Sequence, residues 1–274
     1  MSLFIERLDA AARRNQSLLC VGLDPWLPSM PMFDIPAFNR AIIDATHDLV
    51  CAFKPNYAFY EAEGLSGLLA LEATIKAIKD KGGLVILDAK RGDIGSTATA
   101  YAKAAFEAWD ADAVTVNPYM GGDTLEPFLA YEDRGTLVLT RTSNPGGKDF
   151  EELNVGTEGR PLYEVVTKRA QEWNTASNIG LVVGATAPSE LKRVRELAPD
   201  MPILIPGIGA QGGDLEASVR SGVNAEGLRV MISASRGIIY ASKDADYAEA
   251  ARKAAAAIRE GINAELGRLG HQWQ

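Results

Sequence analysis

Residues 84–116 read LVILDAKRGDIGSTATAYAKAAFEAWDADAVTV, and they carry the clearest signal of the chain's architecture. Leu84–Leu87 and Ala113–Val116 are short, continuous apolar runs, which is typical of strands buried on both faces of a sheet. Between them, Thr97–Trp109 carries apolar residues at helical spacing. The stretch therefore predicts a strand, a crossover helix and a second strand parallel to the first.

The same alternation continues through the chain. Helical patterns over Ser66–Lys81, Leu162–Asn174 and Pro188–Leu197 separate further apolar runs, and no change in composition marks a linker. Eight strand-and-helix units favour a closed (β/α)8 TIM barrel, an α/β fold, over an open doubly wound sheet, so we expect residues 1–274 to form a single barrel domain. The other predicted strands are Leu18–Leu23, Val50–Phe53, Thr136–Thr140, Gly180–Val183, Ile203–Ile205 and Gly227–Ile232.

Composition and charge exclude several classes of protein. The formal net charge of −8 argues against a nucleic-acid or membrane-surface partner, which would require a basic surface. No apolar stretch is long enough to span a membrane, and the N-terminal MSLFIERLDAAARRN is an amphipathic helix rather than a signal peptide, so we expect a cytoplasmic protein. Cys20 and Cys51 lie in apolar runs and are expected to be reduced core residues. With only two histidines, a zinc site is not expected.

In a barrel, functional side chains project from the C-terminal ends of the strands. Alternation along the third strand places Asp88 and Lys90 on one face, and Lys54 adds a second ammonium group from the second strand. Asp93 follows the third strand. The cluster could be a salt-bridge network that closes the barrel mouth. Alternatively, a lysine kept protonated by carboxylates is a poor Schiff-base nucleophile but a good proton donor to a developing carbanion.

A second group of residues follows the seventh and eighth strands. Barrels often bind phosphate with these two loops and a helix N-terminus. Glycines allow backbone amides to approach an anion, and arginine supplies a bidentate guanidinium. The candidates for this phosphate site are Gly207, Gly209, Gln211 and Arg236. Further strand-end candidates are Asp24, Asn117, Thr142, Ser143, Gly184 and Thr186.

The segment from Ser143 to about Arg160, SNPGGKDFEELNVGTEGR, shows no strong periodic pattern. Its glycines and charges predict an exposed loop after the fifth strand. Such a loop is either a tolerated surface insertion or a lid, because loops at this end of a barrel surround the active site.

The segment Asp88-Ala-Lys90-Arg-Gly-Asp93 resembles the Asp-x-Lys-x-x-Asp signature of the orotidine 5'-phosphate decarboxylase family. Five other segments resemble the branch of that family found mainly in mycobacteria and some other bacteria, and together the matches run from about residue 17 to 240. The resemblance implies cofactor-free conversion of orotidine 5'-monophosphate to UMP, the last step of de novo pyrimidine nucleotide biosynthesis, by a homodimer. The five segments are GLDP (22–25), FKPNYAFYE (53–61), VTVNPYMG (114–121), RTSNPG (141–146) and PGIGAQGGD (206–214).

The resemblance also implies roles for the charged residues. Lys90 would protonate C6 of the product base, and Asp88 would lie beside the leaving carboxylate and hold Lys90 in place. Asp93 and Thr97 would reach into the site of the neighbouring subunit, so that each active site is shared. Lys54 would belong to the charged array and also bind the ribose.

Other roles concern substrate binding. Asp24 would bind the ribose hydroxyls, Ser143 the pyrimidine ring, and Gln211 and Arg236 the phosphate. Two positions depart from the family pattern. Asp93-Ile-Gly-Ser-Thr97 stands where many members have Asp-Ile-Pro-Asn-Thr, and Ser235 stands where a glycine often precedes the arginine.

Three alternatives are open to test. A magnesium-dependent sugar-phosphate decarboxylase or hexulose-phosphate synthase resembles the same strand end, but would be expected to carry a glutamate where Lys54 stands. A non-catalytic phosphate sensor would be expected to lose the charged residues. A Schiff-base aldolase would form a borohydride-trappable adduct on Lys90.

Overall fold

The protein, described by a computed structural model over residues 3–209 and 212–273, is built around eight parallel strands. Their order is β2-β1-β10-β9-β8-β5-β4-β3, and single bridges from Phe53 to Val85 and from Asn56 to Asp88 join β2 to β3. The closed barrel predicted from the sequence is thereby confirmed. The strands are β1 (Leu19–Leu23), β2 (Ala52–Pro55), β3 (Ile86–Arg91), β4 (Ala113–Val116), β5 (Gly135–Arg141), β8 (Ile179–Val183), β9 (Ile203–Pro206) and β10 (Val230–Ala234).

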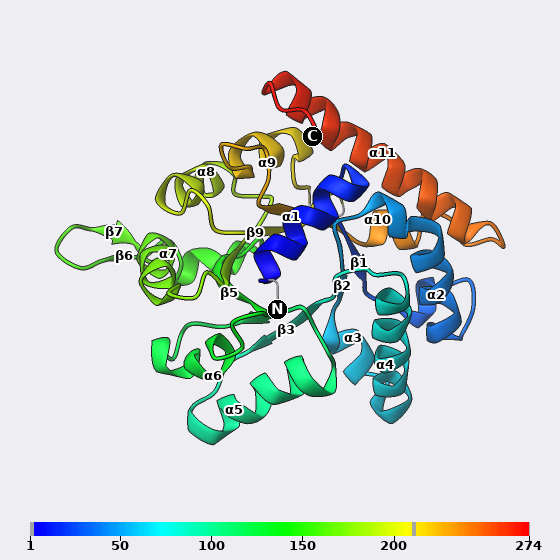
Figure 1. Ribbon diagram of the computed structural model, residues 1–274, viewed down its shortest axis with the longest axis horizontal. Coiled ribbons are helices and arrows are strands. Elements are labelled where there is room, and N and C mark those ends of the chain that lie inside the picture. The colour runs from blue at the N-terminus through cyan, green and yellow to red at the C-terminus, as the bar shows by residue number, and fades with distance from the viewer. Residues whose placement is uncertain (1–2, 210–211, 274) are drawn as a thin grey trace.

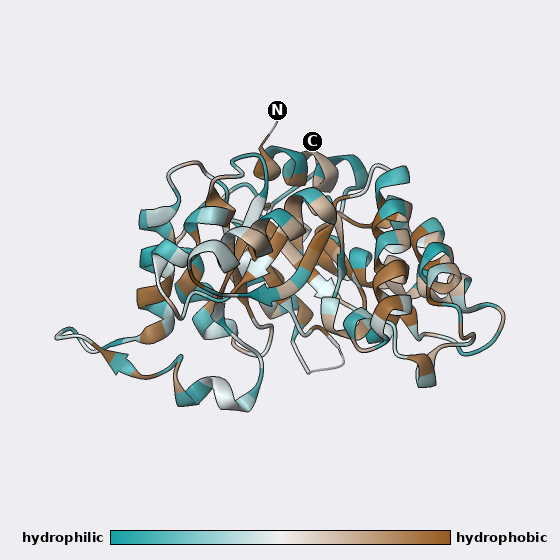
Figure 2. Ribbon diagram, turned by 90° about the horizontal axis from the view of Figure 1, so that it is seen from below, coloured by the Kyte–Doolittle hydropathy of each residue, from teal (hydrophilic) through white to brown (hydrophobic). Residues whose placement is uncertain are grey.

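Helices surround the barrel (Figure 1), and their apolar faces pack against a core of buried strand residues (Figure 2). The long C-terminal helix packs against the first outer helix of the ring and so brings the two ends of the chain together. The helices are α1 (Phe4–Asn15), α2 (Ile35–Thr46), α3 (Tyr57–Glu61), α4 (Gly64–Asp80), α5 (Gly95–Lys103), α6 (Glu126–Leu129), α7 (Leu162–Trp173), α8 (Pro188–Leu197), α9 (Leu215–Gly222), α10 (Arg236–Ile239) and α11 (Tyr247–Arg268).

Helix α1 lies across the end of the barrel where the strands begin (Figure 1). Arg7 forms an ion pair with the buried Asp112, one residue before β4, and Arg229, one residue before β10, is 2.8 Å from the Asp9 carboxylate. Phe4 packs against the backbone at the start of β5. Because α1 covers the N-terminal ends of the strands, the opposite end is left for a site.

Several predicted boundaries are wrong; the second strand is Ala52–Pro55 rather than Val50–Phe53, and the third is Ile86–Arg91 rather than Leu84–Leu87. The eighth strand begins at Val230 rather than Gly227, because Gly227 adopts a positive φ of 75° in a turn. The Asn224 side chain holds this turn by accepting a hydrogen bond from the Leu228 amide at 2.9 Å. The predicted helix Thr97–Trp109 begins at Gly95 and changes to a π-helical turn over Ala104–Ala108.

The segment predicted as a loop after the fifth strand contains regular structure. A 3-10 turn (Pro145–Asp149) is followed by a hairpin of β6 (Asn154–Val155) and β7 (Arg160–Pro161). Figures 1 and 2 show that this hairpin extends away from the barrel. A hairpin of such short strands gains little stability by itself, so its position depends on contacts near the barrel.

The prediction of two buried, reduced cysteines is confirmed. Cys20 and Cys51 are free thiols in the core. Burial raises the pKa of the Cys20 thiol to about 12. Neither thiol is therefore suited to act as a nucleophile at neutral pH.

Candidate active site

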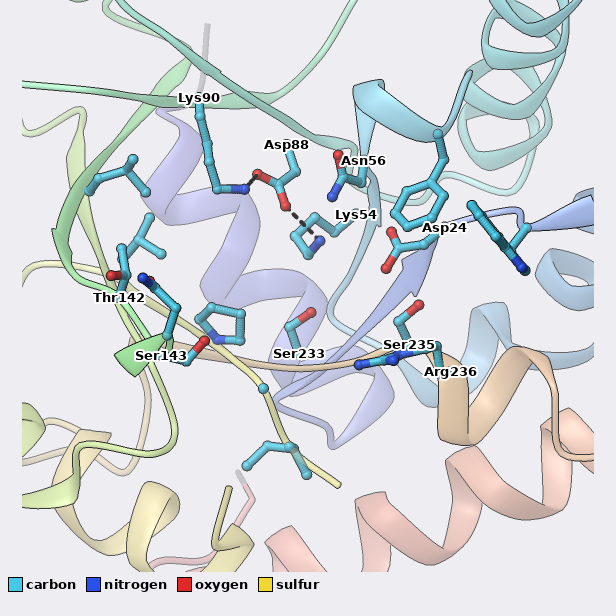
Figure 3. A pocket seen from close by; sticks show the side chains of 18 of the residues that line it. Asp24, Lys54, Asn56, Asp88, Lys90, Thr142, Ser143, Ser233, Ser235 and Arg236 are labelled. Carbon is cyan, nitrogen blue, oxygen red and sulfur yellow. Dashed lines mark hydrogen bonds and ion pairs between the residues drawn. The ribbon is translucent and has the colours of Figure 1, made fainter. Parts of the chain in front are cut away.

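A cavity of about 800 Å³ lies at the C-terminal ends of the strands (Figure 3). Its walls come from loops and strand ends that are far apart in the sequence, as expected for a barrel. The cavity brings together most of the residues singled out from the sequence. Those that line it are Asp24, Lys54, Asp88, Lys90, Thr142, Ser143, Gly207 and Arg236.

Lys54, Asp88 and Lys90 form a charged array at one side of the cavity (Figure 3). The Lys54 ammonium is 2.9 Å from Asp88 Oδ2, and the Lys90 ammonium is 2.6 Å from Asp88 Oδ1. The Lys54 and Asp88 side chains are buried, whereas 49% of the Lys90 side chain is exposed toward the cavity. The array thus presents one exposed ammonium group to a ligand and keeps the other two charges buried behind it.

The buried members of the array stay ionised. Burial alone would raise the pKa of Asp88, but the charges of Lys54 and Lys90 and their hydrogen bonds hold it well below its ordinary value. Burial would likewise lower the pKa of Lys54, yet Asp88 and Asp24 raise it above its ordinary value. With two ammonium groups and one carboxylate, the array has a net positive charge that favours an anionic ligand.

The expectation that Asp88 and Lys90 meet in the barrel mouth is confirmed, but simple strand alternation is not the reason. The pairing of β3 with β4 shifts in register between Leu87 and Arg91. Lys90 adopts a φ of 45°, in the left-handed region that side chains other than glycine rarely occupy. A β-bulge therefore aims Lys90 at Asp88.

The end of β1 contributes Asp24, which faces the cavity beside residues that the sequence reasoning missed. Tyr240 donates a hydrogen bond to the Asp24 carbonyl at 2.9 Å and accepts one from the Trp26 amide at 2.5 Å, which fixes the loop after β1. Asn56 could have been found, because it stands two residues after Lys54 at the end of β2. Tyr240 stands one helical turn beyond Arg236 and could have been suspected from that spacing. The other lining residues that went unrecognised include Trp26, Phe59, Asn144 and Ser233.

The candidate phosphate site lies across the cavity from Lys90 (Figure 3). Arg236 is the first residue of α10 and is exposed to the cavity. Gly207 lines the cavity with a φ of 104°, a conformation that requires glycine. Gly209, with a φ of 76°, is exposed but does not line the cavity. The predicted Gln211 lies outside the described residues.

The strand end that carries Thr142 and Ser143 is held by a buried arginine. Arg141 forms ion pairs with Glu151 at 3.0 Å and with Glu152 at 2.6 Å. The Thr142 hydroxyl and amide both donate to the Glu151 carboxylate, at 2.7 and 2.9 Å. The base of the segment after β5 is therefore fixed next to Ser143. Whether the hairpin beyond it closes as a lid stays a prediction.

Besides Gly209, five candidates are not part of the cavity wall: Asp93, Thr97, Asn117, Gly184 and Thr186. Asp93 is half-buried and accepts a hydrogen bond from the Ile94 amide, and Thr97 is exposed on α5. Asn117 accepts a hydrogen bond from the Tyr119 amide, and Thr186 donates to the Ser143 carbonyl at 3.1 Å. Thr186 thus ties the loop after β8 to the loop after β5, whereas the Asn117 side chain holds a turn within its own loop.

Two further findings concern metals and membranes. Within residues 3–209 and 212–273, no group of three or more histidine, cysteine, aspartate or glutamate side chains is arranged to hold a metal ion. In the same residues, no helix combines the length and apolar character needed to cross a membrane.

Comparison with known proteins places these features in a family. Residues 17–254 match the model of the "Orotidine 5'-phosphate decarboxylase / HUMPS family". The orotidine 5'-phosphate decarboxylase of Ralstonia pickettii (strain 12J) is 55% identical over 95% of this chain and 98% of its own. The structure of Leishmania donovani OMP decarboxylase is 44% identical with a TM-score of 0.85, and the match covers 97% of this chain and 99% of that one. Leishmania donovani UMP synthase matches at 45% identity and a TM-score of 0.87, over 97% of this chain but 57% of that one.

Proposed function

The chain belongs to the orotidine 5'-phosphate decarboxylase / HUMPS family, and from this premise we propose the chemistry of its site. The reaction is the decarboxylation of orotidine 5'-monophosphate to UMP and carbon dioxide, the last step of de novo pyrimidine nucleotide biosynthesis. The observation that carries the mechanism is the charged array, in which Asp88 is held between the ammonium groups of Lys54 and Lys90. No cofactor takes part in the proposed reaction.

The substrate lies across the cavity, with its phosphate at Arg236 and its base at the charged array. Arg236 and the backbone of Gly207 bind the phosphate, and the family resemblance adds Gln211 to this contact. Asp24 and Lys54 bind the ribose hydroxyls, and Ser143 binds the pyrimidine ring. These contacts fix the position of C6 and of its carboxylate relative to Lys90.

The reaction then needs only one proton. The substrate carboxylate is placed beside the ionised Asp88, which disfavours the bound ground state. The C6 to carboxylate bond breaks, carbon dioxide leaves, and the electron pair remains on C6. The Lys90 ammonium stabilises this carbanion and donates a proton to C6. Lys90 suits this role because its side chain extends into the cavity and its charge lies 2.6 Å from Asp88.

The magnesium-dependent relatives are not favoured by this array. Such an enzyme needs acidic oxygen ligands at the strand ends. Here the Asp88 carboxylate already forms an ion pair with the Lys54 ammonium at 2.9 Å. The buried positive charge of Lys54 would also repel a divalent cation. The array is instead suited to act on a carboxylate.

The proposed phosphate contact is tested with two substrates. Wild-type protein is expected to convert orotidine 5'-monophosphate to UMP and to convert the phosphate-free nucleoside orotidine far more slowly. Arg236→Ala is expected to lower kcat/KM for the phosphorylated substrate by about 10- to 100-fold, the value of a charge-assisted hydrogen bond, and to leave orotidine turnover unchanged. Arg169→Ala, on the exposed face of α7, is the matched control. An equal loss with both substrates would contradict the assignment of Arg236 to the phosphate.

We further propose that the enzyme is a homodimer with shared sites. Asp93 and Thr97 do not line the cavity of their own chain, although the family resemblance assigns them to a substrate site. Two apolar side chains that follow β3 and β4 are exposed, Ile94 by 62% and Tyr119 by 81%. Such side chains are typical of a surface that is buried by a second copy.

A complementation experiment tests the shared site. Lys90→Ala and Asp93→Ala are each expected to be nearly inactive alone. If Asp93 serves the partner's site, mixed dimers contain one intact site and one doubly substituted site, so an equimolar, re-equilibrated mixture should recover about a quarter of wild-type activity. The mixture is compared with each variant at the same total concentration. No recovery, with mixed dimers demonstrated by mass, would contradict sharing through Asp93.

We also propose that residues 1–274 act as one barrel domain and that the enzyme works in the cytoplasm. The free thiols of Cys20 and Cys51 agree with a reducing compartment.

A further inference from the structure

The bulge that carries Lys90 faces a single residue of the neighbouring strand. In the β3–β4 ladder Leu87 pairs with Val114, and Arg91 pairs with Val116. Asp88, Ala89 and Lys90 therefore lie opposite Thr115 alone. Three residues cannot be matched by the backbone groups of one residue, so the bulge needs another hydrogen-bonding partner.

The side chain of Thr115 supplies that partner. Its hydroxyl oxygen accepts hydrogen bonds from the Ala89 amide at 3.0 Å and from the Lys90 amide at 2.9 Å. The same hydroxyl donates its proton to Asp88 Oδ1 at 3.1 Å. Thr115 is 1% exposed, so water does not replace these bonds. One buried hydroxyl thus contacts all three residues of the bulge.

These contacts act on both groups that carry out the proposed chemistry. The two amide bonds hold the backbone at Lys90 in its unusual conformation, with a φ of 45°. The third bond reaches Asp88 Oδ1, the same oxygen that accepts from the Lys90 ammonium. Since this hydroxyl has a single proton and gives it to Asp88, the arrangement fixes the direction of all three hydrogen bonds.

We propose that Thr115 is a positioning residue of the decarboxylation, which holds the Asp88–Lys90 bulge so that the Lys90 ammonium and the Asp88 carboxylate are set for the substrate. Thr115 is buried behind the bulge and acts through Asp88 and Lys90 rather than on the substrate. The inference rests on the proposed function of these two residues and adds a residue outside the cavity wall to the machinery.

Thr115→Val tests this inference because valine keeps the shape of threonine and removes only the hydroxyl. We expect kcat for orotidine 5'-monophosphate to fall about 10- to 100-fold, the effect of a small misplacement of a reacting group. KM should change less than about threefold, because the phosphate and ribose contacts are untouched. Thr115→Ser, which keeps the hydroxyl, should retain kcat within about threefold of the wild type.

Thr136→Val is the matched control. Thr136 is also a fully buried barrel threonine, on the adjacent strand β5, and its hydroxyl has no hydrogen-bond partner among the described residues. The same substitution there should leave kcat unchanged. If Thr115→Val fails to fold, Thr115→Ser and Thr115→Ala form a second pair that differs only in the hydroxyl. The serine variant should then have a kcat about 10- to 100-fold higher than that of the alanine variant.

Amide hydrogen exchange separates this inference from the proposed function. The Ala89 and Lys90 amides should be protected in the wild type and lose protection in Thr115→Val, whatever substrate the enzyme uses. Absence of orotidine 5'-monophosphate turnover by the wild type would overturn the proposed function. An active wild type with unchanged kcat in Thr115→Val, or a serine variant as slow as the valine variant, would overturn the role of Thr115.

Discussion

Replacing Lys90 with alanine is expected to lower kcat for orotidine 5'-monophosphate by about 10⁴-fold, at the upper end of the range for loss of a general acid. The variant loses the proton donor to C6 and the charge that stabilises the carbanion. It also leaves Asp88 with one ammonium partner instead of two. The negative charge of Asp88 is then less neutralised and repels the substrate carboxylate more strongly. The rate is followed by the loss of pyrimidine absorbance and by the release of carbon dioxide.

The loss must be separated from a folding defect. Half of the Lys90 side chain is exposed, so its removal should leave the unfolding transition nearly unchanged. Lys76→Ala removes an exposed lysine that is paired with Asp80 on α4, and it should be fully active. A folded Lys90→Ala protein that retains a tenth or more of wild-type kcat would rule out Lys90 as the proton donor.

Replacing Asp88 with asparagine should have the largest effect on stability. Lys54 is buried and loses its direct partner, and breaking one side of a buried ion pair costs about 3–5 kcal/mol. We expect the lower end of this range at pH 7, because the charge of Asp24 still favours the Lys54 ammonium. Denaturant unfolding measures the difference. Asp80→Asn, which breaks the exposed Lys76 pair, should change the free energy of unfolding by less than about 1 kcal/mol.

The difference in free energy of unfolding between the wild type and Asp88→Asn should become smaller at acidic pH. The pKa of Asp88 is lowered in the folded state, so its ionisation stabilises the fold at every pH above the ordinary carboxyl value. That contribution is lost as the pH falls from about 5 toward the lowered folded pKa, because the unfolded chain binds the proton first. The stability gap should therefore be constant between neutral pH and about pH 5 and become smaller below it. A gap that stays constant down to about pH 3 would contradict the ionised state assigned to Asp88.

Much of the fold could be predicted because each unit carries a local signal. Continuous apolar runs mark the buried strands, and helical spacing marks Pro188–Leu197 with the bounds that the structure shows. The error at Gly227 has a local cause as well, because this glycine closes a turn that the side chain of Asn224 holds. The π-helical turn at the end of α5 had no such signal.

The site residues that lie at strand ends could be predicted from the sequence. Those whose role depends on the pairing register of neighbouring strands could not. Strand order alone brings Lys54, Asp88 and Arg236 to one cavity. The bulge at Lys90 depends on pairing between β3 and β4, so the sequence of either strand alone does not reveal the role of Thr115. In the proposed dimer, Asp93 and Thr97 serve the partner's site, which accounts for their position outside the cavity of their own chain.

The most direct measurement is turnover of orotidine 5'-monophosphate by the purified wild-type protein in excess chelator, beside the same protein with added magnesium. In the proposed mechanism the charged array needs only a proton and fixed charges, so the rate of UMP formation should be the same in both samples. Turnover that requires magnesium, or no turnover by a folded protein that instead decarboxylates or condenses sugar phosphates with magnesium, would contradict cofactor-free decarboxylation by Lys90 and Asp88.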